Sequence, residues 1–200
     1  MLALLGAGPG QRVLDFQSGG GYFTELLSYA VGPTGKVIAH NHDRGGVLGP
    51  EVFERRYGGE RLPNVELLFA AHNALALAPG SLDAVLMSMV YHDTYWYQEG
   101  VDWGPVDHAA LLWDLYVALK PEGVILVIDH QAEPGSDPHE SAIATHRIDR
   151  EVVLRDFAAA GFVLKEESDI LRVPADQLAT QIFNETVYRN TDRFVLLFGK

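Results

Sequence analysis

Residues Val13–Thr24 read VLDFQSGGGYFT, and this stretch decides the fold. An apolar run that ends in an acid passes through three glycines and opens a helical pattern. Glycine permits a positive φ and lets the main chain approach a ligand without an intervening Cβ atom. The dinucleotide pattern GxGxxG is not met, because Thr24 stands at its third glycine, and a P-loop lysine is missing too. The stretch predicts a strand, a tight loop and a helix, and the loop is either a ligand-binding loop or a plain structural turn.

Short apolar runs alternate with longer helical patterns along the rest of the chain, which is typical of a parallel sheet covered by helices. The predicted strands are Arg12–Phe16, Lys36–His40, Val65–Ala70, Leu82–Met89, Val124–Asp129, Phe162–Glu167 and Arg193–Phe198. The predicted helices are Tyr22–Val31, Glu51–Arg61, Asp107–Leu119 and Glu151–Ala160, with Lys120–Gly123 as the turn that ends the third. Ligands of such sheets bind beyond the carboxyl ends of the strands, so the turns that follow the strands are where a site is expected.

Composition excludes several classes of protein. The 15 Lys and Arg against 27 Asp and Glu give a formal net charge of −12, which disfavours binding to the phosphates of nucleic acids. The chain has no cysteine, which removes disulfides, thiolate metal ligands and a cysteine nucleophile. No apolar run is long enough to span a bilayer, and Met1–Leu5 lacks the basic flank of a signal peptide. We expect a soluble cytoplasmic protein with neither nucleic acid nor membrane as partner.

Asp15, Gly19 and Gly21 fit the pattern acid-x-Gly-x-Gly-x-Gly except at its first glycine, and three further motifs follow. They are PGSLDAV at 79–85, LKPEGV at 119–124 and AAGF at 159–162. In order and spacing the set resembles the class I S-adenosylmethionine-dependent methyltransferases, and the stretch from Gln11 to Thr24 most resembles a bacterial group of predicted methyltransferases of unknown substrate. The resemblance implies a single domain over residues 1–200, with an α/β, Rossmann-like, doubly wound sheet of seven mostly parallel strands and an antiparallel last strand.

S-adenosylmethionine is the cofactor that this resemblance implies. The residues expected to bind it follow the first four strands: Asp15, Phe16, Gln17, Ser18, Gly19, Gly20, Gly21, Asn41, His42, His72, Asn73 and Ser88. Three of them depart from the family pattern. Gln17 replaces the first glycine, and Asn41 replaces the acid that binds both ribose hydroxyls, so that contact carries no charge. Asn73, or a main-chain carbonyl, would accept the bond from the adenine amine.

The turn after the fourth strand carries the candidate catalytic residues Tyr91, His92 and Asp93. His92 is the candidate general base, with Asp93 able to set its tautomer or pKa, and the alternative is a histidine that is merely hydrogen-bonded in a loop. The aromatic residues that follow would either close over a small organic substrate or pack on the sheet. The expected substrate-binding residues are Tyr95, Trp96, Trp103, His130 and His146.

Histidines and acids recur at these turns, but their spacing matches no tight metal-ligand motif, so no metal is expected. Arg147 would either bind an acidic group of the substrate or belong to the cap of a surface helix. The lid of the site would come from Tyr91–Val106, from Gln131–Thr145, or from a second subunit of a homo-oligomer.

No Lys or Arg occurs between Leu62 and Leu119, whereas seven acidic residues do. The gap reflects either chance or a negative site, because the walls of a cleft focus its field. A negative rim would suit the sulfonium of the cofactor and a neutral or cationic acceptor. We therefore expect a methyltransferase that acts on a small organic molecule. The alternatives are a non-catalytic S-adenosylmethionine-binding protein with a degenerate site and a metal-dependent enzyme on the same fold.

Overall fold

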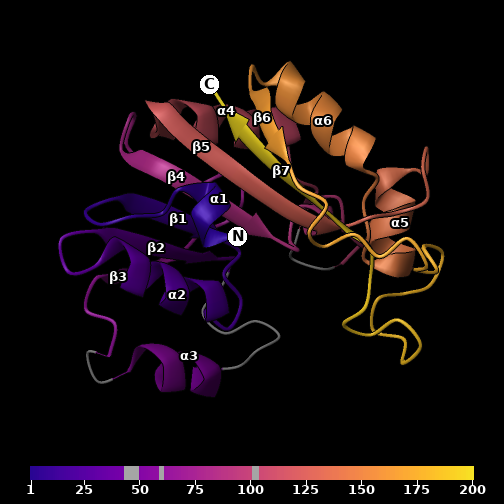
Figure 1. Cartoon of the computed structure of the whole chain (residues 1–200), viewed down its shortest axis with the longest axis horizontal. Coiled ribbons are helices and arrows are strands. Elements are labelled where there is room, and N and C mark those ends of the chain that lie inside the picture. Colours follow the sequence, from indigo (N-terminus) through magenta and orange to yellow (C-terminus); the bar gives the residue numbers. More distant parts are fainter. Residues whose placement is uncertain (43–49, 59–60, 101–103) are drawn as a thin grey trace.

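A single sheet crosses the whole molecule in the computed structural model, which describes residues 1–42, 50–58, 61–100 and 104–200 (Figure 1). The strands lie in the order β3-β2-β1-β4-β5-β7-β6. Their bounds are β1 Arg12–Phe16, β2 Lys36–Asn41, β3 Val65–Phe69, β4 Leu82–Ser88, β5 Leu119–His130, β6 Val163–Glu167 and β7 Arg193–Gly199. Strands β1 to β5 pair in parallel, and β7 runs antiparallel to both β5 and β6. The predicted seven-stranded, mostly parallel sheet with an antiparallel last strand is confirmed.

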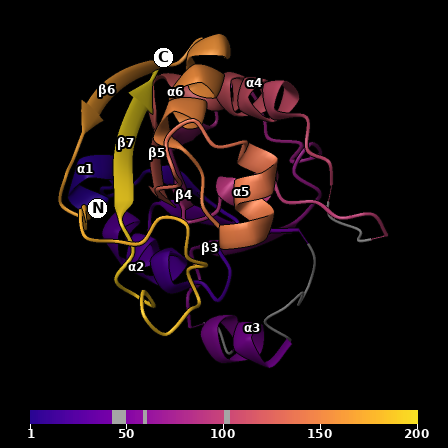
Figure 2. The same cartoon turned by 90° about the vertical axis from the view of Figure 1, so that its right-hand side faces the viewer.

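Helices cover both faces of the sheet (Figure 2). They are α1 Leu2–Leu5, α2 Tyr22–Val31, α3 Pro50–Tyr57, α4 His108–Ala118, α5 Pro138–Thr145 and α6 Arg150–Ala159, and a 3₁₀ turn, η1, spans His92–Thr94. Successive residues of a strand point to opposite faces, so Val13 packs with α2 while Leu14 packs with α4 and α6. Two apolar cores result, one on each face, and they hold the carboxyl ends of β1, β4 and β5 at a common edge.

Some helix and strand boundaries differ from those predicted from the sequence. The turn expected at Lys120–Gly123 lies inside β5, because the pairing steps from Leu82–Leu119 to Ala84–Val124 across a bulge and then resumes. The helix expected at Glu51–Arg61 ends at Tyr57. Helix α5 was missed altogether, although Asp137 accepts a hydrogen bond from the main-chain N–H of Glu140, an N-cap that the local sequence shows.

The described helices are short. None of them combines the length and the apolar character that crossing a membrane requires.

Candidate functional site

The loop Gln17–Gly21, here the glycine loop, leaves the carboxyl end of β1 and enters α2. Gln17, Gly19 and Gly21 have positive φ values of 54°, 54° and 76°, so the chain turns through a left-handed region that favours glycine. A Cβ at Gly21 would overlap the hydroxyl of Tyr57. Gln17, which stands where the family motif has its first glycine, adopts this conformation without being a glycine. Its side-chain amide contacts His72.

Asn41 ties the glycine loop to the end of β2. Its Oδ1 accepts from the N–H of Gly19 at 3.0 Å, and its Nδ2 donates to Ser18 Oγ at 2.8 Å. The ribose contact expected of Asn41 stays a prediction. In the structure the Asn41 side chain acts as a clamp on the glycine loop, because both its Oδ1 and its Nδ2 are hydrogen-bonded to residues of that loop.

Asp15 lies just before the loop and is fully buried. Thr24 Oγ1 in the first turn of α2 donates to Asp15 Oδ2 at 2.6 Å, which joins the strand to the helix on either side of the loop. Burial raises the pKa of Asp15 to about 7, although the hydrogen bonds from Thr24 oppose the shift. Asp15, the acid of the sequence motif, therefore stabilises the glycine loop from within the core through its hydrogen bond to Thr24.

Aromatic rings meet at the ends of β1, β2 and β3. Phe16 stacks on His40 with 4.8 Å between ring centroids, and His72 lies 5.6 Å from Phe16 and 5.5 Å from His42. Burial lowers the pKa of His40 to about 4 and that of His72 to about 3, and the neighbouring histidines add to both shifts. The imidazoles of His40 and His72 are therefore neutral at pH 7, and with Phe16 they form an uncharged platform next to the glycine loop.

Two further expected cofactor residues differ in their surroundings. The side chain of Asn73 accepts from the N–H of Asp107 at 2.9 Å and donates to its carbonyl at 2.8 Å, so an adenine contact would require these bonds to break. Ser88 ends β4, and its buried Oγ has no hydrogen-bond partner among the described residues. A buried hydroxyl of this kind is satisfied when a ligand supplies the partner.

The second group of polar residues, here the His92 cluster, consists of His92, Asp93, Asp129 and His146. His92 Nδ1 is 2.7 Å from Asp129 Oδ1, and His92 Nε2 is 3.2 Å from Asp93 Oδ1. His146 Nδ1 lies 3.8 Å from the same Asp93 oxygen. The cluster joins the turn after β4 and the carboxyl end of β5 to the end of α5.

Charge decides the protonation of the cluster. Burial alone would lower the pKa of His92, but the carboxylates of Asp129 and Asp93 outweigh it and raise the pKa to about 10. Burial likewise opposes ionisation of Asp93, and the facing histidines His92 and His146 lower its pKa nonetheless. His92 is therefore an imidazolium at neutral pH, which is the wrong state for the general base expected from the sequence.

Tyr91 and Tyr95 turn away from the cluster. Tyr91 is completely buried, and its hydroxyl donates to Asp156 Oδ2 of α6 at 2.9 Å. Tyr95 also bonds this carboxylate, stacks on His108 at 3.8 Å, and lines a cavity of about 760 Å³ between α4 and α6. Packing against α4 and α6 thus accounts for the positions of both tyrosine side chains. Trp96 is half-buried, and Trp103 lies outside the described residues.

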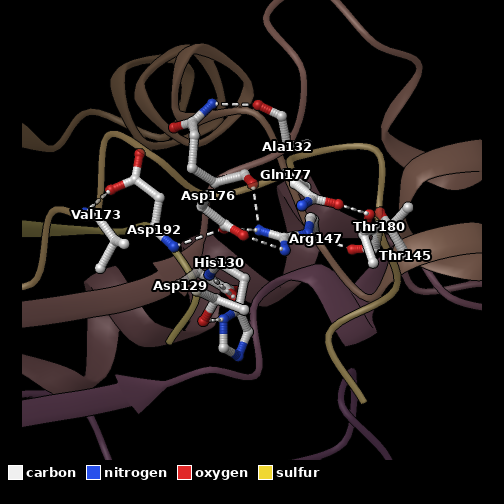
Figure 3. A network of polar contacts seen from close by, with 12 residues as sticks. Asp129, His130, Ala132, Thr145, Arg147, Val173, Asp176, Gln177, Thr180 and Asp192 are labelled. Carbon is white, nitrogen blue, oxygen red and sulfur yellow. Dashed lines mark hydrogen bonds and ion pairs between the residues drawn. The ribbon is translucent and has the colours of Figure 1, made fainter. Parts of the chain in front are cut away.

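Arg147 was expected to bind a substrate acid or cap a surface helix, and both interpretations are wrong. Its side chain is fully buried and pairs with Asp176 at 2.7 Å (Figure 3). It also donates to the carbonyls of Gln131 and Thr180 at 3.0 and 3.1 Å. These bonds fasten the segment between β6 and β7 against the end of β5.

His130 lies in the same region (Figure 3). Its Nδ1 is 2.8 Å from Thr191 Oγ1, and burial lowers its pKa to about 4. Sequence reasoning missed Asp129 as a functional residue. The signal was present, because an acid at the end of a buried strand next to β4 must lie beside the turn that carries His92.

The acidic stretch expected to form a negative rim is divided between the two ends of the sheet. Glu66 pairs with Arg12 and Lys36, and Asp83 pairs with Lys120 at 2.6 Å, all near the amino ends of the strands. Asp107 caps α4. Asp102 of this stretch lies outside the described residues. Among the described residues of the His92 cluster, the negative charge comes from Asp93 and from Asp129, which lies outside the stretch.

The strand order, the antiparallel β7 and the glycine loop after β1 define the fold of the S-adenosylmethionine-dependent methyltransferases. One similar solved structure is a SAM-dependent methyltransferase from Aquifex aeolicus, with 20% identity, a TM-score of 0.67, and coverage of 98% of this chain and 86% of that chain. A second, from Mesorhizobium loti, has 15% identity and a TM-score of 0.66 and covers 99% and 94% of the two chains.

A third similar structure is the Burkholderia thailandensis 1,6-didemethyltoxoflavin-N1-methyltransferase with bound 1,6-didemethyltoxoflavin and S-adenosylhomocysteine. It has 16% identity and a TM-score of 0.65, and covers 100% of this chain and 74% of that chain. No family model and no curated protein sequence matches the chain. At these identities the likeness is one of fold.

Proposed function

We propose that the chain is an S-adenosylmethionine-dependent methyltransferase whose acceptor is a small, neutral or cationic organic molecule. The glycine loop carries this proposal. It has left-handed turns at Gly19 and Gly21, it follows the buried acid Asp15, and its fold is that of solved SAM-dependent methyltransferases, whose glycine motif it resembles. The hydroxyl of Ser88, which has no partner among the described residues, and the neutral platform of Phe16, His40 and His72 lie at the ends of neighbouring strands. Both suit a ligand with a flat, uncharged ring.

Bound S-adenosylmethionine would supply an electrophilic methyl group, which an acceptor takes by direct displacement at carbon. The protein's main task in such a transfer is to hold the acceptor in line. The partly exposed carboxylate of Asp93 can accept a hydrogen bond from an acceptor N–H or O–H. His92 holds this carboxylate in place through Nε2 and is itself held through Nδ1 by Asp129. His92 is thus proposed as a positioning residue.

Replacement of His92 by alanine separates this role from cofactor binding. We expect His92→Ala to lower turnover and raise KM for the acceptor, because Asp93 loses its support, while the Kd of S-adenosylmethionine stays nearly constant. A merely structural role would weaken both ligands together. Unaltered turnover in this variant would show that His92 takes no part in the reaction.

Calorimetric titration with S-adenosylmethionine and with S-adenosylhomocysteine tests the function itself. An enzyme of this class binds both, with one site per chain. Equal and very weak binding of the two ligands would contradict the enzyme and favour a degenerate, non-catalytic protein. The small acceptor and the cytoplasmic location remain part of the proposal, and a panel of amines and phenols with methyl-labelled cofactor would identify the acceptor class.

A further inference from the structure

Three ligand atoms converge at the edge of the sheet from segments far apart in the sequence. One nitrogen of His92, one carboxylate oxygen of Asp93 and one nitrogen of His146 all lie within 4.8 Å of one another. His92 and Asp93 come from the turn after β4, whereas His146 ends α5. No short sequence motif joins them, which is why the spacing of the histidines gave no sign of a metal.

The separations fit a metal ion. Bonds of about 2.1 Å place neighbouring ligand atoms about 3.0 Å apart in an octahedral site and about 3.4 Å apart in a tetrahedral one. The observed distances from Asp93 Oδ1 are 3.2 Å to His92 Nε2 and 3.8 Å to His146 Nδ1. Small rotations of the partly exposed Asp93 and His146 side chains would bring all three atoms to one ion.

The surroundings of His92 supply a second, independent observation. A histidine that binds a metal usually donates its other ring N–H to a carboxylate, which fixes the ring and its tautomer. His92 Nδ1 does so to Asp129, which is fully buried and also accepts the main-chain N–H of His92 at 2.9 Å. This arrangement leaves Nε2 directed toward Asp93 and His146, and a metal ion there would take the place of the Nε2 proton that otherwise pairs with Asp93.

The backbone of His146 provides a third observation. It adopts a φ of 53° as the C-cap of α5, a conformation that side chains other than those of Asn, Asp and His rarely take. The next residue, Arg147, is anchored in the core by its pair with Asp176. The chain thus holds His146 rigidly opposite Asp93, and such local strain persists where the surroundings enforce it.

We propose that His92, Asp93 and His146 bind one divalent transition-metal ion, with Asp129 as the carboxylate that orients His92. Two imidazoles and one carboxylate with open coordination positions suit iron(II) and zinc, whereas magnesium prefers oxygen ligands. The side chains of Asp93 and His146 are 29% and 26% exposed, so the remaining positions face outward. There the ion would act as a Lewis acid toward an oxygen or nitrogen of the substrate. Only this last role rests on the proposed methyltransferase function.

Metal titration of the purified, chelator-treated protein tests the site without cofactor or substrate. Cobalt(II) is followed by its visible absorption and zinc by calorimetry. We expect one ion per chain with micromolar or tighter affinity, and a much weaker response to magnesium. The absence of stoichiometric cobalt and zinc binding, or a preference for magnesium, would overturn the proposal.

Matched variants locate the ion. His146→Asn keeps a residue that tolerates the left-handed backbone while it removes the imidazole, and Asp93→Asn removes the charge. Each should weaken zinc at least tenfold. His139→Asn is the control, because this histidine of α5 stacks on Tyr97 outside the cluster and should leave the affinity unchanged. Asp129→Asn should cost about 10–100-fold through the orientation of His92. Equal zinc affinity in His146→Asn and the wild type would refute the site, whatever S-adenosylmethionine does in the same samples.

Discussion

Arg147→Met should be among the most destabilising single substitutions in the chain. Methionine fills much of the volume of the arginine stem but offers no donor. The change removes two bonds to Asp176, at 2.7 and 3.3 Å, and one each to the carbonyls of Gln131 and Thr180. All of them lie at the point where the segment between β6 and β7 meets the end of β5.

The magnitude follows from what the substitution leaves behind. The Asp176 side chain is fully buried, and breaking a buried ion pair by removing one partner costs about 3–5 kcal/mol. The N–H of Asp192 still donates to Asp176 at 2.6 Å, which offsets part of that cost. The two carbonyls that lose a buried donor add about 1 kcal/mol each. We expect a loss of about 4–5 kcal/mol, a large share of the stability of a domain of this size.

Urea unfolding followed by circular dichroism measures this loss. Arg155→Met is the control, because Arg155 pairs with Asp156 on the surface with its side chain 64% exposed, and such pairs contribute about 1 kcal/mol or less. The double variant Arg147→Met with Asp176→Asn should recover about 1–2 kcal/mol, since the stranded charge is gone. A loss for Arg147→Met no larger than that of the control, or no recovery in the double variant, would refute the reasoning.

Two further substitutions test the glycine loop. The pKa of Asp15 is raised from 3.8 to about 7, so the folded state holds a proton that the unfolded chain has released, and the contribution of Asp15 to wild-type stability should fall between about pH 4 and pH 7. In Asp15→Asn this dependence is absent. Between pH 4 and pH 8 the free energy of unfolding of the variant should therefore rise by up to about 4 kcal/mol relative to that of the wild type. A difference between the two proteins that stays constant with pH would contradict the raised pKa of Asp15. Asn41→Asp keeps the clamp, because both carboxylate oxygens can accept from Gly19 and Ser18, and adds a charge for the ribose hydroxyls. Its affinity for S-adenosylmethionine should rise by about 1 kcal/mol, or fivefold, and a weaker affinity in calorimetry would argue against a ribose near this residue.

Local pattern was sufficient for the sheet. Each of β1, β2 and β4 is a short apolar run that ends at a polar or glycine-rich turn, and the predicted bounds of β1 and α2 agree with the structure. The bulge in β5 was missed because a Lys-Pro-Glu-Gly run has the composition of a turn, and only the pairing with β4 shows that the strand continues through it.

Tertiary arrangement decided the site. The sequence indicated His92 and Asp93 and the strand end at Asp129, but it could not reveal that two carboxylates face one imidazole and hold its pKa near 10. Arg147 was expected to bind an acidic group of the substrate or to belong to the cap of a surface helix, because arginine is rarely buried without a partner. Its partner Asp176 lies in an irregular segment whose path no periodicity predicts, so the buried pair emerged only with the structure.

Binding of S-adenosylhomocysteine to Gly21→Ala tests the central claim most directly, that the glycine loop holds this class of ligand. Alanine at Gly21 would need a φ of 76° and would meet the Tyr57 hydroxyl, whereas Gly8→Ala places a Cβ in ordinary contact, 3.9 Å from the carbonyl oxygen of Gly6, with an ordinary backbone. Calorimetry should give one site per chain in the wild type and in Gly8→Ala, and at least a tenfold weaker Kd in Gly21→Ala with the fold intact. Equal affinities in all three proteins would place the ligand elsewhere and contradict the account.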